Sequence, residues 1–169
     1  MTASLEGMGA LARYLSSLDG FNIKRPAIPA HVFRAERDRA LAPGAPTGLY
    51  PLDLSARLEV EGPATTPLIL ARYARIRAGE SLATAFRAST ELHYAIAGSG
   101  RTTFGAAGAG GAGGDGGAES VAWGPGDVFC LPGGTAVRHQ ATADALLWVV
   151  TNEPQLAFER CAPPGPGQS

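Results

Sequence analysis

The stretch that decides the fold spans residues 79–98 and reads Gly79-Glu-Ser-Leu-Ala-Thr-Ala85-Phe-Arg87-Ala-Ser-Thr-Glu91-Leu-His93-Tyr-Ala-Ile-Ala-Gly98. A second stretch, residues 126–141, reads Gly126-Asp-Val-Phe-Cys-Leu-Pro132-Gly-Gly134-Thr-Ala-Val137-Arg-His139-Gln-Ala141. Each contains a short apolar run beside Gly and Pro, which is typical of β-strands between tight turns. We therefore expect strands at 92–97 and 127–131.

Similar short runs lie on either side of these two stretches. With them, the expected strands cover 68–77, 92–97, 100–104, 120–123, 127–131 and 145–151. Short strands punctuated by Gly and Pro predict an antiparallel sandwich or barrel. Between residues 105 and 118, eight of fourteen residues are Gly. This tract has too few side chains to bury, so we expect a flexible loop at a hairpin tip.

The flanking regions have a different character. Apolar residues recur every three or four positions from Leu5 to Leu18 and stop at Asp19-Gly20, which predicts one amphipathic helix. The proline-rich region 21–67 predicts an extended arm with short strands such as 48–54. The expected organisation is a helix and arm over 1–66, a barrel over 67–160 with its Gly-rich loop at 105–118, and a disordered tail over 161–169.

Composition excludes several classes of function. The 169 residues carry 14 Lys and Arg against 15 Asp and Glu, without a basic block, so no nucleic-acid partner is expected. Hydrophobic residues make up 45% of the chain, enough for a core. The apolar run 145–150 is far shorter than the roughly 20 residues of a membrane helix, so no membrane partner is expected. The first residues, 1–6, include an acid and lead into no apolar signal segment, which predicts a cytoplasmic protein.

The first stretch resembles the first motif of the cupin family. That motif reads Gly, five residues, His, one residue, His, three or four residues, Glu, six residues, Gly. Gly79, Glu91 and Gly98 stand at the matching positions, whereas Ala85 and Arg87 occupy the two histidine positions.

The second stretch is similar to the second cupin motif, in which a Gly, a Pro and a second Gly precede a His and an Asn. Gly126, Pro132 and Gly134 match, but Val137 replaces the histidine and Ala141 the asparagine. The resemblance covers about residues 68–158. It implies an all-β fold, the cupin double-stranded β-helix or jelly-roll barrel, here with an N-terminal helix and an extended arm. The pattern resembles one half of a bicupin of the gentisate 1,2-dioxygenase type.

The same resemblance implies a metal site of three histidines and one glutamate. Of the four family positions, only Glu91 carries a metal-ligating group. Ala85 and Val137 have no donor atom, and Arg87 is permanently protonated. We therefore expect no metal at these positions and no cofactor.

Strand alternation places residues two apart on the same face. If Glu91 faces the barrel interior, so does His93, and Val137 brings His139 inward. We therefore expect a ligand-binding pocket formed by Arg87, Glu91, His93 and His139. By the same alternation, Tyr94 should point outward.

Three interpretations of this pocket remain open. In the first, Arg87 and Glu91 form a buried ion pair in place of the metal, and the histidines are core residues. In the second, Arg87 binds the carboxylate of a small ligand and a histidine exchanges a proton. In the third, Glu91, His93 and His139 form a displaced site for Fe(II) or another divalent metal.

The sequence thus favours a cupin-domain protein that has lost most of the family's metal ligands. We expect a non-catalytic domain that binds a small anionic or aromatic carboxylate ligand or serves in assembly, and that forms a homodimer. The alternative is a metal-dependent oxidoreductase similar to gentisate 1,2-dioxygenase with a reduced or shifted metal site. Trp123 and Trp148 are expected in the core or an interface, and Cys130 in the core.

Overall fold

The computed structural model describes residues 28, 30–105 and 118–163. The predicted helix at 5–18, most of the Gly-rich loop and the end of the tail lie outside the described residues. In this part of the chain there are nine strands and three helices, as follows: α2 (Arg34–Leu41), β1 (Gly48–Pro51), α3 (Ser55–Leu58), β2 (Leu70–Ile76), β3 (Ser81–Thr84), β4 (Thr90–Ala97), β5 (Gly100–Phe104), β6 (Glu119–Trp123), β7 (Val128–Pro132), β8 (Val137–Ala141), β9 (Ala145–Thr151) and α4 (Glu153–Glu159).

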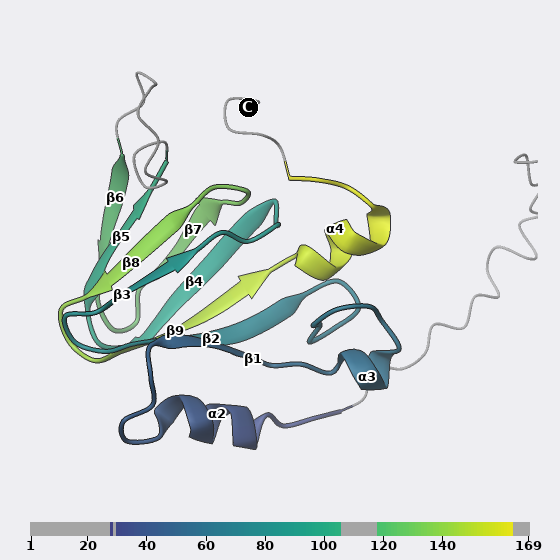
Figure 1. Ribbon diagram of the computed structural model, residues 1–169, viewed down its shortest axis with the longest axis horizontal. Helices are drawn as coiled ribbons and strands as arrows, with labels where there is room; N and C mark the ends of the chain where they lie inside the picture. Colours follow the sequence, from purple (N-terminus) through teal and green to yellow (C-terminus); the bar gives the residue numbers. More distant parts are fainter. Residues whose placement is uncertain (1–27, 29, 106–117, 164–169) are drawn as a thin grey trace, which may run out of the picture.

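The strands form two antiparallel sheets that face each other (Figure 1). One has five strands in the order β1-β2-β9-β4-β7, and the other has four in the order β3-β8-β5-β6. Neighbouring strands come from distant parts of the sequence, since β4 pairs with β9 and β5 with β8. The all-β barrel prediction is confirmed.

Alternate residues of the strands fill the space between the sheets. The core cluster there is apolar and includes Ile76, Phe86, Ala95, Trp123 and Leu147. At the turn from β4 to β5, Gly98 has φ +80°, and an added Cβ would lie 2.4 Å from the carbonyl oxygen of Asp144. Only glycine fits there without strain, which explains why the framework glycine stands at this position.

Three local predictions differ from the structure. The charged run at 34–41 is a helix, because its residues are mostly good helix formers and Ala40 packs completely out of solvent. A second helix, α4, follows β9, with proline in its first turn where a missing N–H costs nothing. Cys130 is exposed, not buried, because Leu131 takes the inward position beside it.

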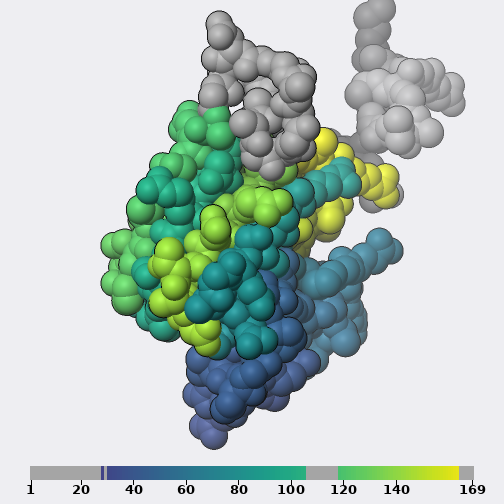
Figure 2. Space-filling view, turned by 60° about the vertical axis from the view of Figure 1, so that its left-hand side comes forward, coloured from purple at the N-terminus to yellow at the C-terminus, as the bar shows by residue number. Residues whose placement is uncertain are grey.

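The arm region packs on the barrel at one end. Its strand β1 extends the five-stranded sheet by pairing with β2, and α2 contacts both strands. In the space-filling view, the dark-blue segment that contains α2 forms the lower end of the molecule (Figure 2). No helix in the described residues is long and apolar enough to cross a membrane.

Candidate functional site

Three of the predicted site residues meet inside the barrel. Glu91 and His93 on β4 are fully buried, and His139 on β8 is 1% exposed. The adjacent Tyr94 points outward, as strand alternation requires. The prediction that Glu91, His93 and His139 face the interior is therefore confirmed.

His93 is held between a carboxylate and an aromatic ring. Its Nε2 lies 3.2 Å from Oε2 of Glu91, and its ring stacks on Phe129 with a centroid distance of 4.9 Å. The ring of His139 is tilted against it at 5.0 Å. Oε1 of Glu91 and Nδ1 of His93 are buried and have no hydrogen-bond partner among the described residues.

His139 belongs to a second buried chain of hydrogen bonds. Nε1 of Trp123 donates to Oγ1 of Thr102 at 2.8 Å, and Oγ1 of Thr102 lies 2.8 Å from Nδ1 of His139. Because indole N–H can only donate, the Thr102 hydroxyl accepts there and can donate its own hydrogen to Nδ1. This leaves Nε2 of His139 as the protonated nitrogen of the neutral ring.

Burial controls the charge of all three groups. It raises the pKa of Glu91 to about 7, although the Arg72 guanidinium favours the carboxylate. Burial, helped by the positive charge of Arg72, lowers the pKa of His93 to about 4. Burial also lowers the pKa of His139 to about 3, with His93 adding to the effect. At neutral pH both histidines are therefore uncharged.

The cation that acts on the charges of Glu91 and His93 is Arg72 on β2, which is not among the site residues predicted from the sequence. Arg72 is 4% exposed, and its Nη2 donates to Oγ1 of Thr151 at 3.1 Å and to Glu153. Its Cζ lies 4.0 Å from the centroid of the Phe86 ring, a cation–π contact. Nη2 makes all the hydrogen bonds of this guanidinium among the described residues.

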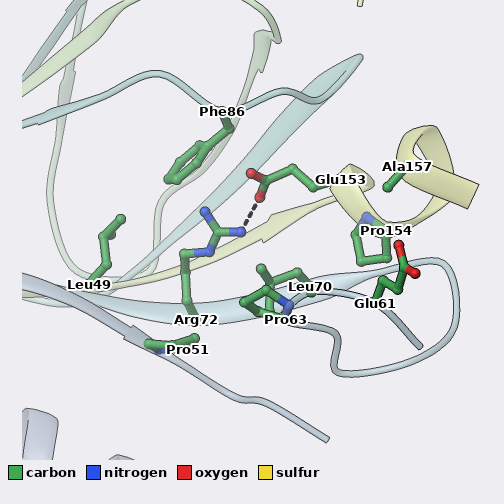
Figure 3. Close-up of a pocket in the computed structure, with 11 residues that line it drawn as sticks. Leu49, Pro51, Glu61, Pro63, Leu70, Arg72, Phe86, Glu153, Pro154 and Ala157 are labelled. Atoms are coloured by element: carbon green, nitrogen blue, oxygen red, sulfur yellow. Dashed lines mark hydrogen bonds and ion pairs between the residues drawn. The ribbon is translucent and has the colours of Figure 1, made fainter. Parts of the chain in front are cut away.

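Arg72 lines a pocket of about 380 Å³ beside α4 (Figure 3). The pair of Arg72 and Glu153 lies at its centre, with Phe86 on one side and Leu70 on the other. The remaining walls are mostly apolar and come from β1, the 61–63 loop and α4: Leu49, Pro51, Glu61, Gly62, Pro63, Pro154 and Ala157.

Arg87 does not join the cluster. It is exposed, and its Nη2 donates to the carbonyl oxygen of Cys161 at 3.0 Å. The prediction of a buried Arg87–Glu91 ion pair is therefore wrong. The reason is the direction of the neighbouring side chains. Phe86 and Ala88 face the interior, so the residues that alternate with them, 85 and 87, point outward.

The residues present do not fit the metal centre that the cupin resemblance implies. At the family positions, Ala85 and Arg87 face outward, and Val137 is buried without a donor atom. Among the described residues, no group of three or more His, Cys, Asp or Glu side chains is arranged to hold a metal ion. The alternative set of Glu91, His93 and His139 is not arranged to hold a metal ion either. In it, Glu91 is hydrogen-bonded to His93, and Thr102 is hydrogen-bonded to His139.

The sequence held only a weak signal for the pocket. Arg72 is a charged residue within the predicted strand 68–77. Two-residue alternation along this strand places its side chain on the same face as Leu70, Ala74 and Ile76, which is the inward face. Its partner Glu153 is 81 residues away, in a helix that was not predicted. Only the pairing of β2 with β9 brings the two together.

Comparisons with known proteins support the fold. No protein-family model matches the chain, and no curated protein matches it. Among solved structures, the chain is similar to salicylate 1,2-dioxygenase from Pseudoaminobacter salicylatoxidans, described with gentisate, at 20% identity and a TM-score of 0.53. That match covers 73% of this chain and 33% of the dioxygenase chain.

The chain is also similar to oxalate decarboxylase from Bacillus subtilis, at 16% identity and a TM-score of 0.50. Here the match covers 64% of this chain and 26% of the other. The chain thus spans about a third of the dioxygenase and about a quarter of the decarboxylase. It has the cupin fold and resembles one half of a bicupin.

Proposed function

We propose that this domain binds a small carboxylate ligand at Arg72 and does so without a metal ion. The observation that carries the proposal is the position of Arg72, a nearly buried guanidinium that lines an otherwise mostly apolar pocket. Guanidinium groups bind carboxylates through paired, charge-assisted hydrogen bonds. Nη1 of Arg72 has no hydrogen-bond partner among the described residues, so it has a donor left for a ligand.

The pocket walls indicate the rest of the ligand. Leu49, Leu70, Phe86 and Pro154 offer apolar contacts around the cation, which suits a compact carboxylic acid with an aromatic or aliphatic body. The similar solved structures are named for salicylate, gentisate and oxalate, all of which are carboxylates. Glu61 and Glu153 would repel a second negative charge. We therefore expect monocarboxylates to bind better than dicarboxylates.

Glu153 occupies the place that the ligand would take. Its carboxylate already accepts hydrogen bonds from Arg72 and from the Thr151 hydroxyl, so a ligand carboxylate must compete with it. Glu153 is more accessible than its partner, with 27% of its side chain exposed against 5% for Arg72. The exposed partner can move into solvent at a lower cost than the buried one.

Calorimetric titration of the full chain with salicylate, benzoate and oxalate tests this function. We expect salicylate and benzoate to bind, and Arg72→Met to lose at least about ten-fold in affinity, since a hydrogen bond to a charged group contributes about 1.5–3 kcal/mol. Glu153→Gln should bind more tightly because the internal competitor loses its charge. Arg75→Gln is the matched control, because Arg75 lies on the same strand but pairs with Asp144 away from the pocket. Failure of every ligand to bind, or equal binding by Arg72→Met, would contradict the proposal.

A dioxygenase-like or other metal-dependent oxidoreductase role rests only on the likeness of fold. The donor set described above does not support such a role at this site. A role in assembly as a homodimer and a cytoplasmic location remain predictions from the sequence.

A further inference from the structure

The outer face of the five-stranded sheet, opposite the core, carries a row of aromatic side chains. One row of cross-strand neighbours passes over all five strands on this face, and it is aromatic except at its end: Tyr50, Tyr73, Trp148, Tyr94 and Val128. These residues alternate along their strands with the inward-facing Arg72, Val149 and His93. The row is therefore an apolar stripe on the face opposite the core.

Half of this face is covered. The helix α2 contacts β1 and β2 and lies on the side of the sheet away from β3, β5 and β8 (Figure 1). Consistent with this cover, Tyr50 and Tyr73 at this end of the row are half-buried. Helix α2 thus forms a partial third layer on the outer face of the five-stranded sheet.

On the other half of the face, over β9, β4 and β7, Leu146 of β9 is buried, but several other large side chains are exposed in the described part of the chain, and we call this the bare half. Trp148 is 38% exposed, Tyr94 37%, Ile96 39% and Val128 61%. Cys130 is also exposed on this face, opposite Leu92 of β4. Large apolar side chains gathered on one face in this way mark a docking surface.

We propose that the N-terminal segment of this same chain, residues 5–18, packs on the bare half of the sheet beside α2. The sequence of this segment predicts an amphipathic helix with one apolar stripe: Leu5, Met8, Leu11, Leu15 and Leu18. A helix with such a stripe needs an apolar surface to bury it. The bare half of the sheet is a surface of that kind. The described chain begins beside α3, where Nδ1 of His31 lies 3.4 Å from Nη1 of Arg57 (Figure 1), so the segment must run back along the sheet to reach it.

The dimensions agree with this arrangement. A helix of this length is about 21 Å long and about 10 Å wide with its side chains. Three strands spaced at about 4.8 Å span a similar width. The ten residues from Leu18 to Ile28 can extend about 33–36 Å, which matches the diameter of about 35 Å expected for a domain of this size. The segment can therefore reach the face from Ile28, which is itself exposed.

The two cysteines of the chain make the test direct. Cys130 lies on the bare face, and Cys161 follows α4 and is also exposed. In the full chain, Cys161→Ser leaves Cys130 as the only thiol, and Cys130→Ser leaves Cys161. The rate of reaction with Ellman's reagent then measures how well each thiol is covered.

We expect Cys130 to react at least about ten-fold more slowly than Cys161, which corresponds to about 1.4 kcal/mol of protection. Leu11→Glu with Leu15→Glu should bring the two rates together, because charges on the apolar stripe prevent docking. The control pair Ala10→Glu and Ser17→Glu lies on the opposite side of the predicted helix and should leave Cys130 protected.

Two results would overturn the proposal. One is rapid reaction of Cys130 in the unchanged chain. The other is protection that rises with protein concentration and tracks dimer formation in light scattering, which would assign the face to a second copy. Neither result bears on carboxylate binding, because the pocket lies on the other side of the sheet.

Discussion

Nε2 of His93 lies 3.2 Å from Oε2 of Glu91, and neither side chain exposes any surface. With the pKa of Glu91 raised to about 7 and that of His93 lowered to about 4, the histidine is neutral when the carboxyl group loses its proton. The proton therefore leaves this pair near neutral pH and leaves a buried negative charge. The nearest compensating cation is Arg72, which Glu153 already neutralises.

Replacing Glu91 with Gln should stabilise the protein at high pH. A carboxyl group whose pKa rises from 4.5 to about 7 on folding binds its proton more tightly in the native state, so it reduces stability as pH rises through this window. Relative to the unchanged protein, Glu91→Gln should gain about 2–3 kcal/mol between pH 5 and pH 8.5. Urea unfolding at both pH values measures this gain, and a stability difference independent of pH would contradict it.

The chain of hydrogen bonds at Thr102 should contribute strongly to stability. Thr102→Val keeps the shape but leaves Nε1 of Trp123 and Nδ1 of His139 buried without partners. We expect a loss of about 2–4 kcal/mol, since each such group costs about 1–3 kcal/mol. Thr102→Ser retains the hydroxyl and should lose only about 1 kcal/mol. Equal losses in the two variants, measured by urea unfolding, would show that the hydroxyl is unimportant.

Removal of Arg72 should destabilise the protein far more than removal of Arg87. Arg87→Ala removes an exposed side chain with one hydrogen bond to a carbonyl, so we expect a change within about 0.5 kcal/mol. Arg72→Ala leaves Glu153 without its cationic partner and opens space beside Phe86. We expect a loss of about 3–5 kcal/mol for this change. Thermal unfolding of the two variants side by side would refute this assignment if Arg87→Ala proved the more damaging.

Gly98 should tolerate no side chain. Its positive φ and the nearby carbonyl of Asp144 mean that Gly98→Ala combines backbone strain with a steric clash, and we expect a loss of at least about 2 kcal/mol. Gly124 is the matched control, because a Cβ added there meets nothing within 4 Å. A Gly124→Ala variant should unfold within a few degrees of the unchanged protein, and a similar result for Gly98→Ala would contradict the close contact in the structure.

The sequence was sufficient to predict the fold and the interior side of two strands. Framework residues such as Gly98 and Gly126 are tied to backbone conformations that other residues rarely adopt, so their spacing carries information. The inward positions of Glu91, His93 and His139 could also be predicted, because side chains alternate strictly between the two faces of a strand.

The sequence did not predict which cation serves the site. Arg87 stands at a family ligand position, but residues 85–89 lie between β3 and β4, outside any strand. Alternation counted back from Glu91 does not continue through such a segment. Arg72 and Glu153 meet only through the pairing of β2 with β9, and a contact across 81 residues leaves no trace in local patterns.

The position of Glu153 at the first residue of α4 has a further consequence. The carboxylate that holds Arg72 also anchors the start of that helix to the barrel. A ligand that displaces Glu153 therefore removes one of the contacts that dock α4. By thermodynamic linkage, occupancy of the pocket and attachment of the helix must oppose each other by the same free energy. Amide hydrogen exchange in residues 153–159 would then report ligand binding at a distance from the ligand itself.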